Sequence, residues 1–488
     1  MLKQLTNHIH VIILFVLALV QSTYLYRKIE QFQWIGADDL LTITLINQDV
    51  FSFIQGLGSG LNLFPPLYYV LGYFLTNLCD FPKEFLLWIH IPVLWGSIWL
   101  TYLIFRNFSD SQIASLATVI LMTIKSAFLT QAIYVRPYCF YYVAALALLF
   151  SVIKFQKSYS TKRLIFLWVS FQCLALTHYY GLPIGLLICV PLLLCHLGIS
   201  AKIKYLTLIL LPTIISYSVF LPKQLGYIFA KGTLPDININ ILIEIYKSLI
   251  IPGLVTLLIF LILGCFYYRE FKVLKSAAPW PMINLSLAPI IIGFFLFITS
   301  KEGFYYRYFI PCQVGLSGMA LWVGNHLIKI PIGNKCSITL VFLSICSISL
   351  WGVRNFDNER NLIKQSYPGS MDFNHDRILQ DNIPFATSHL PTFLKLIHDP
   401  TWATRSRLLR TEEKDFHELP KYNKLLTPIS LLELKRENSF YYHFYYSGPH
   451  SNIDFDPYTW AQKNNFSVNK ICEYPVVIKF THKNNAKN

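Results

Sequence analysis

Apolar segments of about 20 residues recur through the first 350 positions of this 488-residue chain and then stop. A helix of that length spans the ~30 Å hydrocarbon core of a bilayer. Composition agrees, because 54% of the residues are hydrophobic and only 14% are charged, whereas soluble proteins average about 25% charged residues. The pattern predicts an all-α polytopic membrane domain.

Eleven segments are apolar and long enough to be transmembrane helices. A twelfth stretch, 65–79, is apolar but short and begins with Pro65-Pro66, which suits a first helical turn. We expect a re-entrant or interfacial helix there, the alternative being a true span. The expected spans are 9–26, 85–106, 111–131, 138–155, 163–177, 180–197, 203–221, 249–268, 282–298, 308–328 and 336–352.

The positive-inside rule decides the expected orientation. With a cytoplasmic N-terminus and eleven spans, the inner loops carry 13 basic and two acidic residues, and the outer loops carry nine of each. Counting 65–79 as a span would place the basic loops KFQKSYSTKR and YREFKVLK outside. We therefore expect a multi-pass protein of the bacterial inner membrane, whose first helix is an uncleaved span rather than a signal peptide.

The C-terminal quarter of the chain has a different composition. Residues 353–488 hold 18 basic and 15 acidic residues, against 23 and 11 in residues 1–352. Segments such as SFYYHFYY and PVVIKFTHK have strand composition, so we expect a small extracytoplasmic α/β domain. The net charge of +15 lies mostly in the membrane part. It indicates contact with anionic lipid head groups and not with nucleic acid.

Two adjacent carboxylates, Asp38 and Asp39, follow the first span at the start of a long outer loop, 27–84. Apolar residues then recur at helical spacing to Phe53, which predicts a helix along the membrane surface, ended by Gly56, Gly58 and Gly60. One role for the Asp pair is to cap this helix. The other is chemistry in a lipid-facing cavity, and both can hold together.

Three further outer-face residues are candidates for a site. Arg136 and Arg307 lie at the outer ends of spans; each is either an interfacial arginine or an anion clamp, since a guanidinium matches phosphate oxygens. His178, in the turn THYYG, is either a hydrogen-bonded structural residue or, together with a carboxylate such as Asp39, a ligand for a divalent ion.

Taken in order, these motifs resemble the GT-C class of polytopic glycosyltransferases over residues 8–350. That class includes the dolichyl-phosphate-mannose protein mannosyltransferases and the bacterial lipid A aminoarabinose transferases. The matching residues are Asp38-Asp39, Pro65 to Tyr69, Arg136 with Tyr138, His178 to Tyr180, and Arg307-Tyr308. The chain departs from the pattern twice: the acidic pair is usually Asp-Glu, and a His commonly stands where Phe64 precedes the prolines.

The resemblance implies transfer of one sugar from a polyprenyl-phosphate carrier to a glycan, lipid or protein acceptor outside the cytoplasm, with inversion. Asp38 would be the general base and Asp39 would orient it or the acceptor. Arg136 and Arg307 would neutralise the leaving phosphate. The other candidates for substrate binding are Tyr138, His178, Tyr179 and Tyr305.

A transporter or flippase of a lipid-linked sugar is the alternative function. Such proteins commonly have repeated halves and charges deep within spans. Here no half-repeat is evident, and Lys125 is the clearest charge within a span. A noncatalytic scaffold is a third possibility, which the clustered outer motifs disfavour.

Overall fold

A computed structural model of the chain describes residues 2–31, 37–57, 64–82, 85–108, 112–124, 127–194, 198–231, 280–298, 306–327, 385–387, 406–408, 439–444, 466–473 and 476–482. The chain divides into two compact units. The first comprises Met1–Gln33 and Asn62–Arg354, and the second comprises Trp34–Leu61 and Asn355–Asn488. The stretch that carries Asp38 and Asp39 thus groups with the C-terminal residues.

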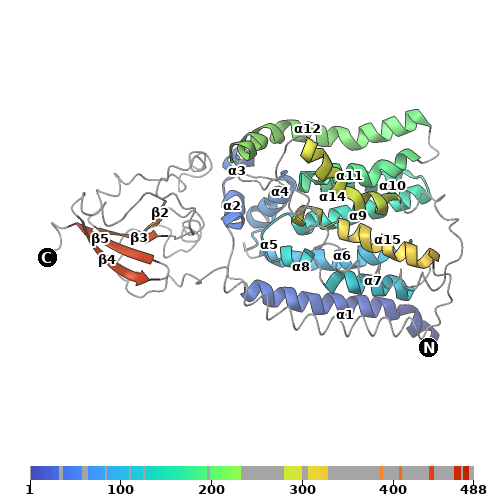
Figure 1. Cartoon of the computed structure of the whole chain (residues 1–488), viewed down its shortest axis with the longest axis horizontal. Coiled ribbons are helices and arrows are strands. Elements are labelled where there is room, and N and C mark those ends of the chain that lie inside the picture. The colour runs from blue at the N-terminus through green and yellow to red at the C-terminus, as the bar shows by residue number, and fades with distance from the viewer. Residues whose placement is uncertain are drawn as a thin grey trace. The chain divides into compact units, whose positions relative to one another are not determined.

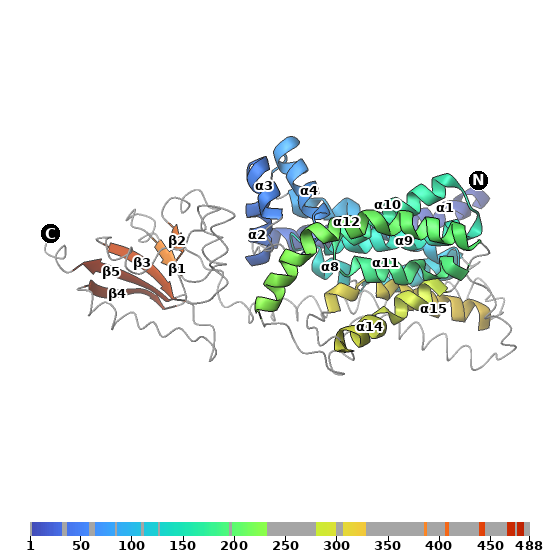
Figure 2. The same cartoon turned by 90° about the horizontal axis from the view of Figure 1, so that it is seen from above.

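The first unit is helical, and its long helices run side by side (Figures 1 and 2). Four of its described helical segments are long and apolar enough to cross a membrane: His10–Ile29, Phe85–Phe105, Tyr138–Lys157 and Lys202–Pro222. The helices are α1 (Leu2–Gln31), α4 (Leu67–Tyr73), α5 (Phe85–Trp88), α6 (His90–Phe105), α7 (Gln112–Ile124), α8 (Ala127–Gln131), α9 (Tyr138–Lys157), α10 (Thr161–Thr177), α11 (Gly181–Cys189), α12 (Ile199–Lys231), α14 (Trp280–Ile298) and α15 (Cys312–Leu327), with the short helices η1 (Phe74–Leu78), η2 (Val190–Leu194) and η3 (Tyr306–Phe309).

Helix α9 forms the centre of this unit. It contacts α6, α10, α11 and α14, and Leu148, Leu149 and Val152 along it are fully buried. Its first turn carries Tyr138 and Tyr141, both also buried. Among the four described helices of membrane-spanning length, α9 is the most buried, and it begins at the residues that the sequence places at the site.

The periphery of the unit is apolar where a soluble protein would be polar. On α1, Phe15 and Val20 are 53% and 62% exposed, and on α14, Phe294 and Phe295 are 65% and 66% exposed. A monomeric protein in water rarely exposes apolar surface of this extent. These faces are instead suited to contact with the hydrocarbon of a bilayer.

Inside the unit, polar side chains form hydrogen bonds between neighbouring helices. Trp95 of α6 donates to the Ser22 hydroxyl of α1 at 2.7 Å. Between α10 and α12, Gln172 donates to the Ile209 carbonyl at 2.6 Å and accepts from the Thr213 hydroxyl at 2.9 Å. Hydrogen bonds of this kind hold helices together where no hydrophobic force acts between them.

The apolar segment within the first outer loop is as short as predicted. Helix α4 begins at Leu67 and continues as the π-helical turn η1 to Leu78. These 12 residues cover about 18 Å at 1.5 Å per residue, too little for the hydrocarbon core. The predicted spans 249–268 and 336–352 lie outside the described residues, so the total of eleven stays a prediction.

In the second unit, the prediction of a single helix from Asp39 to Phe53 is wrong. The chain forms α2 (Ala37–Ile46) and α3 (Val50–Leu57) instead. The break follows from Asp49, whose Oδ1 accepts from the N–H groups of Phe51 and Ser52 at 3.0 Å. An aspartate that satisfies the free N–H groups of a first turn starts a new helix.

The C-terminal residues of this unit form a five-stranded sheet in the order β2-β1-β3-β5-β4. Strand β1 pairs in parallel with β2 and β3, and β5 pairs antiparallel with β3 and β4. The predicted strands in SFYYHFYY and PVVIKFTHK are confirmed, whereas β4 was not foreseen. The strands are β1 (Phe385–Thr387), β2 (Ser406–Leu408), β3 (Ser439–Phe444), β4 (Phe466–Glu473) and β5 (Val476–His482).

Candidate functional site

His178 lies in the turn between α10 and α11. Its backbone is extended, with φ −151° and ψ 140°, so it ends α10. Its carbonyl oxygen accepts from the N–H of Gly181 at 2.7 Å, which closes the turn. Although it lies outside the helices, the side chain is only 2% exposed.

Gly181 makes this turn possible because α11 starts against the end of α10. A Cβ at this position would lie 2.1 Å from the Leu174 carbonyl oxygen and 2.7 Å from its carbonyl carbon. These are backbone atoms that no rotamer change can move. Only glycine therefore permits the approach that turns His178 into the interior.

The hydrogen bond to the His178 ring defines its tautomer. The backbone N–H of Tyr180 donates to Nδ1 at 3.1 Å, so Nδ1 carries the lone pair. Burial, and secondly the charge of Arg307, lower the pKa of His178 from 6.5 to about 3. The ring is therefore neutral near pH 7 and carries its proton on Nε2.

That Nε2–H group is buried and makes no hydrogen bond to any residue that the structure describes. A buried donor without a partner costs roughly 1–3 kcal/mol. Such groups in folded proteins call for a specific explanation, such as a ligand or an ordered water. The donor therefore indicates a candidate binding site in the first unit.

Five aromatic rings surround the imidazole, and we call this group, with His178 itself, the His178 cage. They come from the start of α9, from the turn after His178, from η3 and from the residue before Pro65. The distance from the ring centroid of His178 to that of each neighbour is 5.1 Å for Phe64, 5.7 Å for Tyr138, 4.8 Å for Tyr141, 5.8 Å for Tyr180 and 4.9 Å for Tyr308.

Arg307 provides the positive charge beside the cage. Its guanidinium carbon lies 5.6 Å from the ring centroids of both Tyr138 and Tyr308, within the range of cation–π attraction. The hydroxyl of Tyr141 donates to the Tyr308 carbonyl oxygen at 2.8 Å and so ties η3 to α9. These contacts hold a cation next to a neutral N–H donor.

The structure brings several predicted site residues together. Tyr138, His178 and Arg307 meet at the cage, and Arg136 is half-buried and close enough for its charge to oppose that of Arg307. Tyr179 faces a different neighbour: its ring packs against Tyr217 of α12 at 5.3 Å. Tyr305 lies outside the described residues.

Asp38 and Asp39 lie in the first turn of α2. The helix begins before them, at Ala37, so neither residue precedes the first turn as the expected cap would. Acidic residues in a first turn interact favourably with the positive end of the helix dipole. Their side chains lie outside what the structure describes.

The hydrogen bonding of His178 does not suit a metal ligand. A histidine that binds a metal through one nitrogen normally donates the proton of the other to a carbonyl or carboxylate. Here Nδ1 already accepts an N–H, so Nε2 must keep its proton for the ring to stay neutral. Among the described residues no three His, Cys, Asp or Glu side chains converge on one point.

Sequence reasoning did not assign Phe64 or Tyr141 to the site. Phe64 was noted only because a histidine commonly precedes the prolines in the family pattern. In the structure its ring packs against both Tyr138 and His178. Helical spacing offered a signal for Tyr141, which lies one turn after Tyr138 on the same face of α9.

Comparison with known proteins bears on the fold. No protein-family model matches the chain, and no curated protein matches it in sequence. The structure is similar to that of ArnT from Cupriavidus metallidurans bound to undecaprenyl phosphate, with a TM-score of 0.58 and 12% sequence identity over 98% of each chain. The chain thus has the fold of ArnT, a lipid A aminoarabinose transferase of the GT-C class, as the resemblance predicted.

Proposed function

We propose that this membrane protein transfers a single sugar from a polyprenyl-phosphate-linked donor to an acceptor on the extracytoplasmic face. The ArnT-like fold supports the reaction class, and the undecaprenyl phosphate bound to ArnT supports the class of donor. The observation that carries the proposal is the buried Nε2–H of His178, which has no partner among the described residues and lies beside the Arg307 guanidinium.

The donor phosphate is the group that this arrangement suits. A phosphate oxygen accepts hydrogen bonds, and its charge is balanced by Arg307 with Arg136 nearby. Arg136 and the cage residues from Tyr138 to Tyr180 belong to a stretch, 111–235, that contains no acidic residue. A bound phosphate would therefore meet no competing carboxylate from this stretch.

The transfer itself needs a base for the acceptor hydroxyl. In our proposal Asp38 accepts the hydroxyl proton while the hydroxyl oxygen forms a bond to the anomeric carbon. The bond from that carbon to the phosphate oxygen breaks, and the polyprenyl phosphate leaves with the electron pair. A single displacement of this kind inverts the anomeric carbon, and Arg307 stabilises the charge of the leaving group. Asp39 orients the base or the acceptor.

Cells that lack the protein provide the first test. Mass spectrometry of their envelope glycans and lipids should reveal one missing sugar, which identifies donor and acceptor. Purified protein in liposomes should then glycosylate that acceptor. Relocation of the lipid-linked sugar without glycosylated product would contradict the transferase and favour the transporter.

The Asp38→Asn variant tests the base. It should lose transfer while it still binds undecaprenyl phosphate and inserts into the membrane. Asp49→Asn is the matched control, because Asp49 only starts α3 and asparagine also caps helices. Near-normal transfer by Asp38→Asn would remove Asp38 as the base.

A further inference from the structure

The helices α4 and η1, which together we call the α4–η1 segment, start and stop at one end of the helical unit. Just before the segment, the ring of Phe64 packs against that of Tyr138 at the start of α9, with the centroids 5.7 Å apart. Just after it, Phe81 stacks on Phe85, the first residue of α5, at 4.3 Å. In Figures 1 and 2, α4 lies at the end of the unit opposite the N-terminus.

The helices on either side of the segment begin together because α6 and α9 are parallel. At one end, His90, the first residue of α6, donates from Nδ1 to the Ala132 carbonyl oxygen at 2.7 Å, and its ring contacts that of Phe140 in the first turn of α9 at 5.9 Å. At the other end, Lys157 of α9 donates to the side-chain oxygen of Asn107, which follows α6, at 2.8 Å. The α4–η1 segment therefore leaves one end of the bundle and returns to that same end.

A segment that enters a membrane and returns to the same side must reverse its direction within the membrane. The α4–η1 segment instead forms one continuous helical run from Leu67 to Leu78, about 18 Å long at 1.5 Å per residue. The run ends before Asp80, whose φ of 54° is the left-handed conformation common after a helix. A single run cannot reverse, so the segment lies along the end of the bundle.

The two faces of the α4–η1 segment have different surroundings. Its inner face is buried, and Tyr68 on that face contacts Phe140 of α9 with the ring centroids 5.6 Å apart. Its outward face carries Val70, Phe74 and Leu78, which are 46%, 49% and 69% exposed. Residues four apart share one side of a helix. The segment therefore presents a continuous apolar stripe outward.

The polar side chains of the segment are suited to a medium without water. The Thr76 hydroxyl donates to the Gly72 carbonyl oxygen at 3.0 Å, and the Asn77 side-chain nitrogen donates to the Tyr73 carbonyl oxygen at 3.3 Å. No residue from 50 to 79 is charged. The outward face can therefore enter an apolar medium without the high cost of burying a charge.

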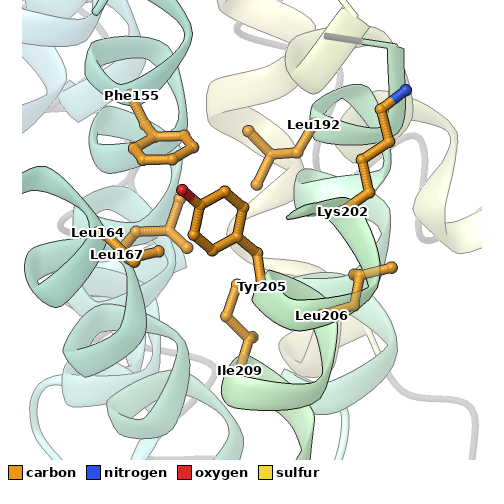
Figure 3. Close-up of a pocket in the computed structure, with 8 residues that line it drawn as sticks. All are labelled: Phe155, Leu164, Leu167, Leu192, Lys202, Tyr205, Leu206 and Ile209. Atoms are coloured by element: carbon orange, nitrogen blue, oxygen red, sulfur yellow. The ribbon is translucent and has the colours of Figure 1, made fainter. Parts of the chain in front are cut away.

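Elsewhere in the unit, apolar side chains of neighbouring helices cover one another. Between α10 and α12, Leu167 and Ile209 lie with Tyr205 around a small cavity (Figure 3), and the ring of Phe155 packs against that of Tyr205 at 5.8 Å. The outward face of the α4–η1 segment is instead as exposed as the apolar surface of α1, on which Phe15 is 53% exposed. This face is therefore continuous in character with the surfaces suited to lipid.

We propose that the α4–η1 segment lies in the leaflet at this end of the unit, parallel to the membrane plane, with Val70, Phe74 and Leu78 among the upper acyl chains. Interfacial helices bury an apolar face ~5–10 Å into a bilayer in this way. The partner is the phospholipid itself, and the contact does not depend on sugar transfer. Because only Pro65 and Pro66 separate α4 from Phe64, the membrane fixes the depth of the His178 cage.

Photolabelling of the full-length protein in phosphatidylcholine liposomes tests this placement. One phosphatidylcholine probe carries a diazirine near the glycerol backbone and a second carries it at the end of an acyl chain, and tandem mass spectrometry identifies the labelled residues. Phe74 and Leu78 should react with the shallow probe and not with the deep one. Val20, which is 62% exposed near the middle of the span His10–Ile29, should react with the deep probe and serves as the control for insertion.

Two results would overturn the proposal. Labelling of Phe74 or Leu78 by the deep probe would mean that the segment enters or crosses the hydrocarbon. Absence of label from both residues, while Val20 is labelled, would mean that a partner protein or a second copy of the chain covers this face instead of lipid.

The Phe74→Asp variant tests the lipid contact itself by placing a charge on the outward face. It should reduce shallow labelling of Leu78, because a carboxylate disfavours insertion of that face. Cys79→Asp is the matched control, since Cys79 is also exposed but lies past the helix, beside the charged Asp80. Deep labelling of Val20 should persist in both variants. Unchanged labelling of Leu78 in Phe74→Asp, or equal losses in the two variants, would contradict the lipid contact.

Discussion

The backbone N–H of Tyr180 donates a hydrogen bond to Nδ1 of His178 at 3.1 Å. Because a main-chain group makes this bond, the identity of side chain 180 does not affect it. It leaves His178 with a single proton, on Nε2, directed away from its own turn. The chemistry available at this position is therefore hydrogen-bond donation by a neutral ring.

Replacing His178 tests that donor. His178→Phe keeps an aromatic ring in the cage but removes the N–H, and should weaken binding of undecaprenyl phosphate by about 10- to 100-fold, the value of a hydrogen bond to a charged group. His178→Gln, which keeps a side-chain N–H, should lose less. Binding is measured by native mass spectrometry. Equal affinities for the Phe and Gln variants would rule out His178 as a hydrogen-bond donor to the phosphate.

Arg307→Lys tests whether the guanidinium shape matters. Lysine keeps the charge but cannot bind phosphate through two parallel N–H groups, so we expect weaker binding of undecaprenyl phosphate and slower transfer. Arg163→Lys is the matched control, because that arginine hydrogen-bonds at the far end of α10. Similar losses in both variants would indicate a general charge effect and not a site.

Acid should destabilise the protein through His178. Burial, and then Arg307, hold the pKa of His178 at about 3 against 6.5 for an ordinary histidine. Between these values the unfolded chain binds a proton that the folded chain does not, so stability is complete above pH 6.5 and falls as the pH drops toward 3. The loss approaches about 1.4 kcal/mol per pH unit.

Thermal unfolding in detergent between pH 8 and pH 4 measures this effect. His178→Gln cannot titrate in the range, so the wild type should lose its stability advantage over this variant as the pH falls. A difference that stays constant with pH would show that the pKa of His178 is the same in the folded and the unfolded chain. Donor binding at pH 6 to 8 should show no step caused by His178.

Gly181→Ala should destabilise the turn between α10 and α11. The added methyl meets the Leu174 carbonyl, and overpacking of this kind typically costs about 1–3 kcal/mol. Gly96→Ala on α6 is the matched control, because no atom lies within 4 Å of a Cβ there. Gly181→Ala should lower the melting temperature and Gly96→Ala should not. Equal melting temperatures would contradict the close packing of the two helices.

Much of the helical unit could be predicted from the sequence. Membrane spans depend on local hydropathy, so residues 138–155 and 163–177 emerged as helices with ends within two residues of those in the structure. The break between α2 and α3 was missed because apolar spacing continues across it. A capping aspartate at position 49 outweighs that spacing, since it offers the backbone a partner in a new first turn.

The site was predictable in part. The span count predicted that Tyr138, His178 and Arg307 share one face of the membrane domain, and the three residues lie together in the structure. Their surroundings did not follow, because Phe64, Tyr141 and Tyr308 come together only through the packing of helices far apart in sequence. Nor could the sequence reveal the tautomer of His178, which depends on one backbone N–H two residues away.

The contact between Gly181 and Leu174 has a consequence for affinity. It fixes the turn against the body of α10, so the Nε2–H donor has its position before any ligand arrives. Binding then requires little loss of conformational entropy in the protein, and more of the interaction energy contributes to affinity. The site is preorganised, and the residue responsible has no side chain.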